Sequence, residues 1–449
     1  MPRVSTGAMV GAVAAIGALV ALVATRSGGR NDKSPGRASA AASASAAASD
    51  AAAHAVRALP GCHPTMVGGT LAKVAPGALS LAVVKDRALL VGTLAEGARP
   101  RAERVVLDRM GAPAGPVEAV NDALPAGPGV ATFAAALAED GRLTTLTYAA
   151  RRPTAVECAD GLLVSKVVDA GEPHTGAGAD TGADAGAGAG APRRELLTRS
   201  CRASSMLVAA ARGSLGIALL DGATTADGDP QAAPAIADAV VIAGLGSSQT
   251  RLETVSGGAT IAQAATAAGA TSVAAAYVVA HGGTRELHVV QLGKNGKVAT
   301  KVEVFDKQNV GTVTVAYEGD TLHVVWSSFV PEKNRFVLRW SKWLAGAAPA
   351  ATQSIGTGVL SAVAPSLAVD RGRFMLAWTN GDEKDSTVKV GSSMNGVVAI
   401  SGLASVVSTP GALAREPVVA LDGDTMFVAW KELGGPEPEV HAAAISCRE

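Results

Sequence analysis

Apolar and polar positions recur at a fixed interval near the C-terminus of this chain. Three short apolar runs each lead, through a charged or glycine turn, into a second apolar run; they are Val315-Ala316, Leu367-Ala368 and Val419-Ala420. The second run of each pair ends at a tryptophan: Trp326, Trp378 or Trp430. The interval is 378−326 = 52 and 430−378 = 52 residues. An interval of this size indicates a repeat built from one supersecondary unit.

The same pattern returns far upstream. Residues 80–93 align without a gap on residues 366–379, with seven of fourteen positions identical and Gly92 in the place of Trp378. The distance is 378−92 = 286 residues, and the Gly/Ala/Asp-rich stretch 171–195, which we do not expect to be strand, removes 25 to leave 261. Five intervals of about 52 residues fill this distance, so the sequence predicts seven units.

Each unit is expected to contain two β-hairpins. The first hairpin is marked by tight-turn dipeptides between two apolar runs: Asp140-Gly141, Arg212-Gly213, Gly319-Asp320, Arg371-Gly372 and Gly423-Asp424. The second is marked by Asp160-Gly161, Asn295-Gly296 and Asn395-Gly396. The positions equivalent to the tryptophans are Gly92, Thr147, Leu219, Tyr277, Trp326, Trp378 and Trp430. Two hairpins make a four-stranded antiparallel sheet, so the predicted fold is an all-β, seven-bladed β-propeller with the tryptophans packed between blades. The alternative is an array of two or three β-sandwiches.

The last unit lacks a fourth strand. Its strands are expected near 417–422, 425–432 and 439–446, after which only three residues remain. A strand donated from about Thr65 to Val74 would complete the sheet and remove an exposed edge. That arrangement brings together Cys62 and Cys447, for which we predict a disulfide, and leaves Cys158 to pair with Cys201. Free thiols at Cys158 and Cys201, or zinc bound by cysteines, are the alternatives; no Cys-x-x-Cys motif is present.

A hydrophobic segment near the N-terminus indicates export of the protein. Residues 8–24 form an uninterrupted apolar run of 17 residues, so residues 1–26 are expected to be a signal peptide or signal anchor. The basic residues that follow this run oppose the charge bias of an outward-facing anchor. Residues 27–60 are an Ala/Ser/Gly-rich linker, and residues 61–449 are assigned to the propeller. We expect a periplasmic, cell-envelope or extracellular protein with a possible membrane tether through residues 8–24.

Charge and motifs narrow the function classes. The chain has 39 basic and 39 acidic residues, which gives no support to nucleic-acid binding. It contains no nucleophile elbow, phosphate-binding loop or His-Glu-x-x-His motif, and the seven histidines form no cluster at ligand spacing. We therefore expect no cofactor and no metal.

Carboxylates gather in the connections between second and third strands, which in a propeller share one face with the connections between blades. The candidate binding residues there are Glu332, Asp382, Glu383, Asp385, Glu432 and Glu437. Paired carboxylates can act as acid and base on a glycan, but the same residues also suit solvated turns balanced by lysines. Trp340 and Trp343 are three residues apart on one strand, so at most one can be exposed to stack on a sugar.

In interval and turn placement, residues 61–447 resemble exported bacterial β-propeller repeat proteins. The Trp-Asp and Gly-His pairs of WD40 repeats are missing, as is the Ser-x-Asp-x-Gly-x-Thr-Trp box of sialidase-type propellers. The resemblance therefore implies a fold but transfers no functional residue. The favoured hypothesis is a binding or scaffolding module for a protein or glycan partner at the cell envelope. The alternative is a glycan-acting hydrolase or lyase.

Overall fold

The computed structural model describes residues 63–73, 79–84, 87–96, 99–119, 130–137, 143–149, 162–168, 195–198, 206–211, 215–220, 237–243, 249–255, 260–293, 300, 302–394, 396–434 and 439–446. The chain divides into two units, Met1–Asp50 and Ala51–Glu449, and every described residue belongs to the second. Segments 1–26 and 27–60 and all four cysteines lie outside the described residues. Within the described part of the chain, no helix has the length and apolarity needed to cross a membrane.

The described strands all pair into four-stranded antiparallel sheets. In the N-terminal half, the strands are β1 (His63–Lys73), β2 (Leu79–Val84), β3 (Arg87–Glu96), β4 (Arg99–Leu107), β5 (Glu118–Ala119), β6 (Val130–Leu137), β7 (Leu143–Ala149), β8 (Leu162–Val168), β9 (Glu195–Thr198), β10 (Met206–Ala211), β11 (Leu215–Leu220), β12 (Ala237–Ala243) and β13 (Gln249–Val255).

In the C-terminal half, they are β14 (Thr260–Ala268), β15 (Ser272–His281), β16 (Thr284–Gly293), β17 (Glu303–Asp306), β18 (Val310–Glu318), β19 (Thr321–Val330), β20 (Arg335–Leu344), β21 (Gln353–Ile355), β22 (Ala362–Asp370), β23 (Arg373–Gly381), β24 (Ser386–Ser393), β25 (Ser405–Val406), β26 (Ala414–Asp422), β27 (Thr425–Glu432) and β28 (Glu439–Ser446). Two 3₁₀ helices, η1 (Pro331–Lys333) and η2 (Val397–Leu403), lie between strands.

Six sheets follow chain order: β2–β5, β6–β9, β10–β13, β14–β17, β18–β21 and β22–β25. β9 begins at Glu195, the last residue of the stretch that the sequence analysis excluded from strands, because Glu195 pairs with Val164 of β8. The seven positions aligned with the tryptophans all fall in the second strand of a sheet, as predicted.

The turns between first and second strands lie where the sequence predicts them in the described part. Gly319 and Gly423 adopt φ angles of 58° and 55°, and Arg371 and Gly372 adopt 49° and 78°. This left-handed conformation closes a two-residue hairpin with the twist of its strands.

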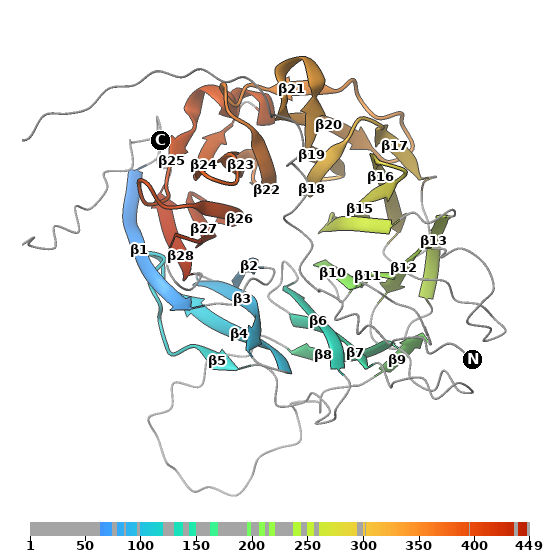
Figure 1. Ribbon diagram of the computed structural model, residues 1–449, viewed down its shortest axis with the longest axis horizontal. Helices are drawn as coiled ribbons and strands as arrows, with labels where there is room; N and C mark the ends of the chain where they lie inside the picture. Colours follow the sequence, from blue (N-terminus) through green and yellow to red (C-terminus); the bar gives the residue numbers. More distant parts are fainter. Residues whose placement is uncertain are drawn as a thin grey trace, which may run out of the picture. The chain divides into compact units, whose positions relative to one another are not determined.

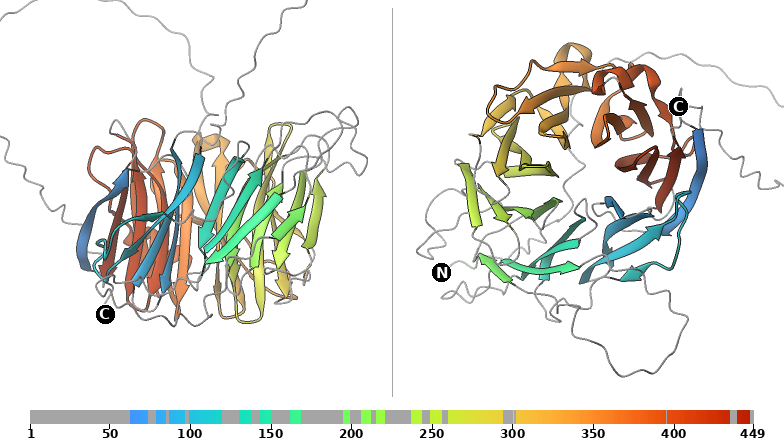
Figure 2. Two further views of the ribbon diagram at one scale, coloured as in Figure 1. Left: turned by 90° about the horizontal axis from the view of Figure 1, so that it is seen from below. Right: turned by 180° about the vertical axis from the view of Figure 1, so that it is seen from behind.

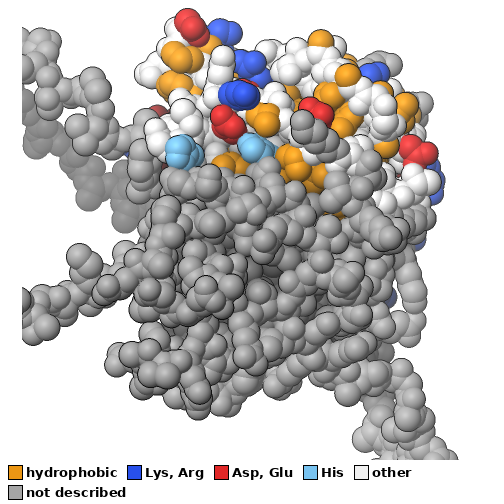
Figure 3. Space-filling model, turned by 90° about the vertical axis from the view of Figure 1, so that its right-hand side faces the viewer, with side chains coloured by type: hydrophobic (Ala, Val, Ile, Leu, Met, Phe, Trp, Pro, Cys, Tyr) orange, Lys and Arg blue, Asp and Glu red, His pale blue; other side chains and the backbone are white. Residues whose placement is uncertain are grey.

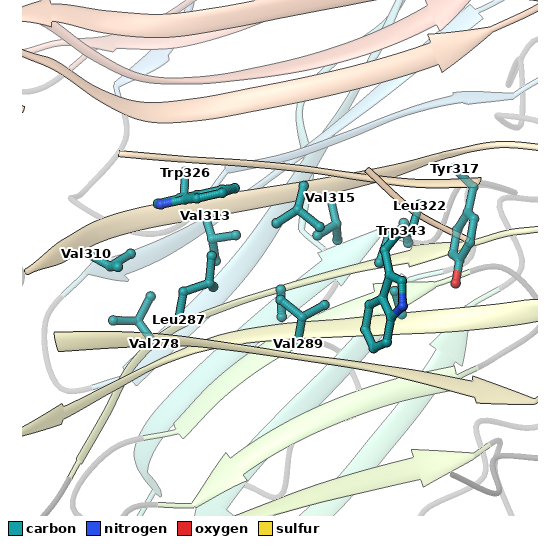
Figure 4. Close-up of a cluster of buried hydrophobic side chains, with 14 residues drawn as sticks. Val278, Leu287, Val289, Val310, Val313, Val315, Tyr317, Leu322, Trp326 and Trp343 are labelled. Atoms are coloured by element: carbon teal, nitrogen blue, oxygen red, sulfur yellow. The ribbon is translucent and has the colours of Figure 1, made fainter. Parts of the chain in front are cut away.

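Both faces of the second strands are covered. All residues of β23 after Arg373 are buried, as are all residues of β27 after Thr425. Trp326, Trp378 and Trp430 are at most 1% exposed. Figure 4 shows Trp326 among valines and leucines of its own and the preceding sheet, which confirms the predicted packing between sheets. On β20, Trp343 is buried and Trp340 is half-buried, in agreement with their expected opposite faces.

Neighbouring sheets are also joined by a repeated hydrogen bond. The Oγ1 of Thr314 accepts the backbone N–H of Leu367 at 3.2 Å, and the Oγ of Ser366 accepts that of Val419 at 3.1 Å. Donors and acceptors are each 52 residues apart, since 366−314 = 52 and 419−367 = 52. The sequence interval therefore equals one step from sheet to sheet.

First strands of successive sheets contact one another in the order β2, β6, β10, β14, β18, β22 and β26, and β26 contacts β2 (Figure 1). The left view of Figure 2 shows the sheets from the side, with their strands running next to one another across the described part. The fold is all-β and propeller-like, and this succession of contacts does not fit separate sandwiches.

The last sheet combines both ends of the described chain, in the order β1-β28-β27-β26. β1 pairs with β28 in an antiparallel register that runs from His63 opposite Ser446 to Lys73 opposite Glu439. The donated strand predicted from about Thr65 to Val74 is thus confirmed, beginning two residues earlier. Without β1, β28 would be an unpaired edge.

Candidate ligand-binding face

In the three C-terminal sheets, the described connections between second and third strands lie beside the connections between sheets, and we call this end of the sheets the loop face. Three backbone hydrogen bonds join the end of a second strand, or the residue after it, to a connection between sheets: Phe329 N to Asn309 O, Gly381 N to Ser361 O and Leu433 N to Leu413 O. This confirms, for the three C-terminal sheets, that these segments gather at one end of the strands. Figure 3 shows acidic and basic side chains interspersed on one side of the described part.

Three of the six candidate carboxylates lie in one tight turn. Asp382 Oδ1 accepts the backbone N–H groups of Lys384 at 2.8 Å and Asp385 at 3.0 Å. These two bonds lower the pKa of Asp382, and they outweigh desolvation, which acts in the opposite direction and raises it. The turn needs glycine before it, because a Cβ on Gly381 would lie 2.0 Å from the Asp385 carbonyl oxygen. Asp382 therefore shapes its own turn, and Glu383 and Asp385 extend from it into solvent.

The other candidates are dispersed. Glu332 is exposed in η1, and Glu437 lies outside the described residues. Glu432 is buried, and its Oε1 accepts the indole N–H of Trp430 at 2.9 Å and the backbone N–H of Thr409 at 3.0 Å. Its Oε2 lies 3.4 Å from His441 Nε2. The position of Glu432 is fixed by these partners, so the six residues do not form one cluster among the described residues.

A different group of charges concentrates at the loop-face end of β26 and β27. We call Arg415, Glu416, Lys431 and Glu432 the charged corner; Arg415 opposes Lys431 in the ladder. Lys431 Nζ forms an ion pair with Glu416 Oε2, and the lysine side chain is 8% exposed whereas that of Glu416 is 51% exposed. A buried ammonium beside a half-exposed carboxylate is unusual for a surface pair.

Arg415 connects the charged corner to the preceding sheet. Its Nη2 donates to the Asp382 carbonyl oxygen at 3.2 Å, and its Nε donates to Ser386 Oγ at 3.4 Å. Both acceptors are neutral, and the guanidinium is half-buried. The charged corner thus lies next to the turn that carries Asp382, Glu383 and Asp385.

Glu416 occupies a left-handed backbone conformation, with φ at 52°, directly before Pro417. It lies where the ladder between β26 and β27 shifts register between Arg415 and Val418. Thr379 Oγ1 of the preceding sheet accepts the Glu416 backbone N–H at 3.0 Å and holds this conformation. Ala364, 52 residues earlier, has the same conformation, with φ at 49° before Pro365.

The sequence predicts Glu432 and Asp382 as candidate site residues but not Arg415 or Glu416. A signal was present in the 52-residue alignment, which places Arg415-Glu416 on Val363-Ala364. The pairing of Glu416 with Lys431 follows from the register shift, which the sequence does not show. Among the described residues, no group of three or more acidic, histidine or cysteine side chains is arranged to hold a metal ion.

Comparisons with known proteins identify the fold only. No protein-family model matches the sequence. No curated protein matches it either. Among solved structures, an ulvan lyase from a polysaccharide lyase family has a TM-score of 0.50 at 8% identity, over 85% of this chain and 96% of its own.

Two further structures have the same kind of likeness. A prolyl endopeptidase has a TM-score of 0.49 at 13% identity, over 81% of this chain and 46% of its own. The endosialidase of phage phi92 has a TM-score of 0.45 at 8% identity, over 85% of this chain and 69% of its own. Because the identity to the ulvan lyase is 8%, that likeness describes a propeller-like fold and no particular activity.

Proposed function

We propose that the protein binds a glycan through its loop face, with the charged corner as the point of contact. The observation that carries this proposal is the half-exposed Glu416 carboxylate, which lies beside Lys431 and next to the half-buried Arg415. A sugar hydroxyl both donates and accepts a hydrogen bond. The Glu416 carboxylate can therefore accept a hydrogen bond from one hydroxyl of a sugar, and the Arg415 guanidinium can donate to another.

Binding is favoured over acid/base catalysis by the state of the other carboxylates. Glycoside hydrolysis needs two carboxyl groups that face each other across the scissile bond. Asp382 caps its own turn, from which Glu383 and Asp385 extend into solvent. The oxygens of Glu432 contact Trp430, Thr409 and His441. Glu416 is thus the one carboxylate of the charged corner that is half-exposed.

Cleavage of the glycan is the second candidate function. The observation in its favour is Glu416 itself, since a carboxylate that faces solvent can take a proton from a bound sugar. The ulvan lyase acts on a polysaccharide with a fold of this kind. A propeller-like fold is therefore compatible with both candidates.

The proposed scaffold is a closed propeller of seven blades. Its support is the pairing of the described strands into seven four-stranded sheets, together with the contact between β26 and β2. We propose that Cys62 pairs with Cys447 to lock the closure, and that Cys158 pairs with Cys201. Such disulfides fit export through residues 1–26 to the periplasm, envelope or exterior, with residues 8–24 as a possible membrane tether.

The test is electrophoresis of the full-length protein through native gels that contain dextran, xylan or alginate. We expect at least one polysaccharide to retard the protein, and the charge-swapped variant Arg415→Glu to lose this retardation. Equal mobility in all gels would contradict glycan binding. Release of new reducing ends from the retarding polysaccharide would favour the enzymatic candidate, and its absence would favour the binding module.

A further inference from the structure

We infer that the Glu416–Lys431 ion pair is maintained for ligand binding and not for folding. This inference rests on the proposed function, because it assigns the role of one pair within the glycan-binding face. It also implies that the ion pair can be replaced by neutral residues without loss of stability, which is testable without any glycan.

The two preceding sheets hold neutral residues at the positions equivalent to Glu416 and Lys431. The positions 52 residues before Glu416 and Lys431 hold Ala364 and Thr379, and those 104 residues before hold Thr312 and Ser327. All four counterparts are neutral, and each lies in a sheet with the same strand order. The fold therefore accommodates neutral side chains at both positions in the two preceding sheets.

The burial of Lys431 has a cost in desolvation. Lys431 is buried, and taking its ammonium out of water costs free energy that one ion pair only partly returns. Ser327 and Thr379 at the equivalent positions act as hydrogen-bond partners without this cost: Ser327 Oγ accepts the Thr312 N–H at 2.9 Å, and Thr379 Oγ1 accepts the Glu416 N–H at 3.0 Å. A charge at this position is thus not needed to satisfy the backbone.

Glu416 and its counterpart Ala364 share a left-handed backbone conformation. A left-handed conformation costs free energy for any residue with a Cβ, and Glu416 and Ala364 both adopt it. At Ala364 the N–H is accepted by Thr312 Oγ1 at 2.8 Å, and the side chain is a methyl group. At Glu416 the same conformation carries a carboxylate that is half-exposed on the loop face. Fixed polar groups of this kind lower the entropic cost of binding a ligand.

The test replaces the ion pair by the neutral residues found at the equivalent positions of the preceding sheet. Glu416→Ala together with Lys431→Thr copies Ala364 and Thr379 into the last sheet. The two single variants are measured beside it. The matched control is Arg373→Thr with Asp424→Ala, which removes an ion pair of 3.6 Å between an 11% exposed arginine and the turn of the next sheet, at the end of the strands away from the loop face.

We expect Glu416→Ala alone to lower the Tm, because it leaves the Lys431 ammonium buried without its carboxylate. The double variant is expected to recover a Tm at least equal to that of the wild type. Its affinity for the retarding polysaccharide (dextran, xylan or alginate) is expected to fall about tenfold or more, the loss for a hydrogen bond to a charged group. The control pair is expected to leave this affinity unchanged.

A double variant whose Tm is as low as that of Glu416→Ala would overturn the inference, because the pair would then serve folding. Unchanged affinity of the double variant for the polysaccharide would also overturn the inference, because the pair would then not serve binding. If no polysaccharide retards the wild type, the proposed function fails, whereas the order of the Tm values still decides whether the pair serves folding.

Discussion

His63, the first residue of β1, pairs with Ser446, the last residue of β28. Cys62 precedes His63 and Cys447 follows Ser446, so the next step of this antiparallel ladder would place the two cysteines opposite each other. We predict a disulfide between them. On the chain-entropy model, closing so long a loop contributes about 6 kcal/mol, and strain in the folded state reduces this value.

Peptide mapping of the unreduced protein checks this prediction. One peptide pair linked through Cys62 and Cys447 is expected, and reduction separates it. Alkylation of both thiols in the native, unreduced protein would contradict the prediction. The variant Cys62→Ala with Cys447→Ala is expected to have a lower Tm than the wild type.

Trp326 and Trp378 occupy equivalent buried positions but differ in their hydrogen bonds. Trp326 Nε1 donates to Asp306 Oδ2 at 2.8 Å, whereas the buried Trp378 Nε1 has no partner among the described residues. Both Trp→Phe changes remove the same volume. We therefore expect Trp326→Phe to lose about 1–2 kcal/mol more stability than Trp378→Phe, measured by denaturant unfolding. Equal losses would show that the Asp306 bond contributes nothing.

Asn380 and Glu432 are also equivalent, 52 residues apart. Glu432 accepts the Trp430 indole N–H, whereas the buried Asn380 Oδ1 has no partner among the described residues. We predict that Glu432→Asn lowers the free energy of unfolding by about 1–3 kcal/mol, since it leaves buried donors without an acceptor.

The reciprocal change tests the same network. Asn380→Glu offers an acceptor to Trp378, and Lys389 lies opposite Trp378 as His441 lies opposite Trp430. A cation is therefore in place to compensate the new carboxylate, and we expect the Tm to rise. A fall in Tm would mean that desolvation of the carboxylate exceeds the gain.

The sequence predicted the architecture well because its periodic signal is the same signal that builds the sheets. Turns at Gly319, Arg371 and Gly423 and the strands of the last sheet follow directly from apolar runs and tight-turn residues. The candidate site was harder to predict. Carboxylates in loops led to the loop face as the candidate, but contacts such as Glu432 with Trp430 depend on which way a side chain points. Those contacts decide whether a charge is free to bind.

The buried His323 gives the protein a pH dependence. It lies between two sheets, with its ring stacked on Trp340 and edge-on to Phe374. Trp340 Nε1 donates to its Nδ1 at 3.2 Å, so this nitrogen is an acceptor in the folded state. Burial lowers the pKa of His323, opposed by Glu318, whose Oε2 lies 3.4 Å from Nε2, and assisted by Lys342.

Because the folded state binds this proton less well than the unfolded state, His323 contributes stability above its unfolded pKa of about 6.5. That contribution is lost as the pH falls from there through the folded pKa. We expect the Tm of the wild type to fall more steeply below pH 6.5 than the Tm of His323→Gln. Parallel Tm profiles of the two proteins would contradict the assignment.

The two ends of the described chain share one sheet, with β1 as its outer strand. Hydrogen exchange of the β28 amides tests this arrangement, because β28 pairs with β27 on one side and with β1 on the other. Amides of residues 439–446 are expected to be protected along the whole strand in the full-length protein. In a variant that lacks residues 1–73, those facing β1 should exchange faster. Equal exchange in the two proteins would contradict the shared sheet.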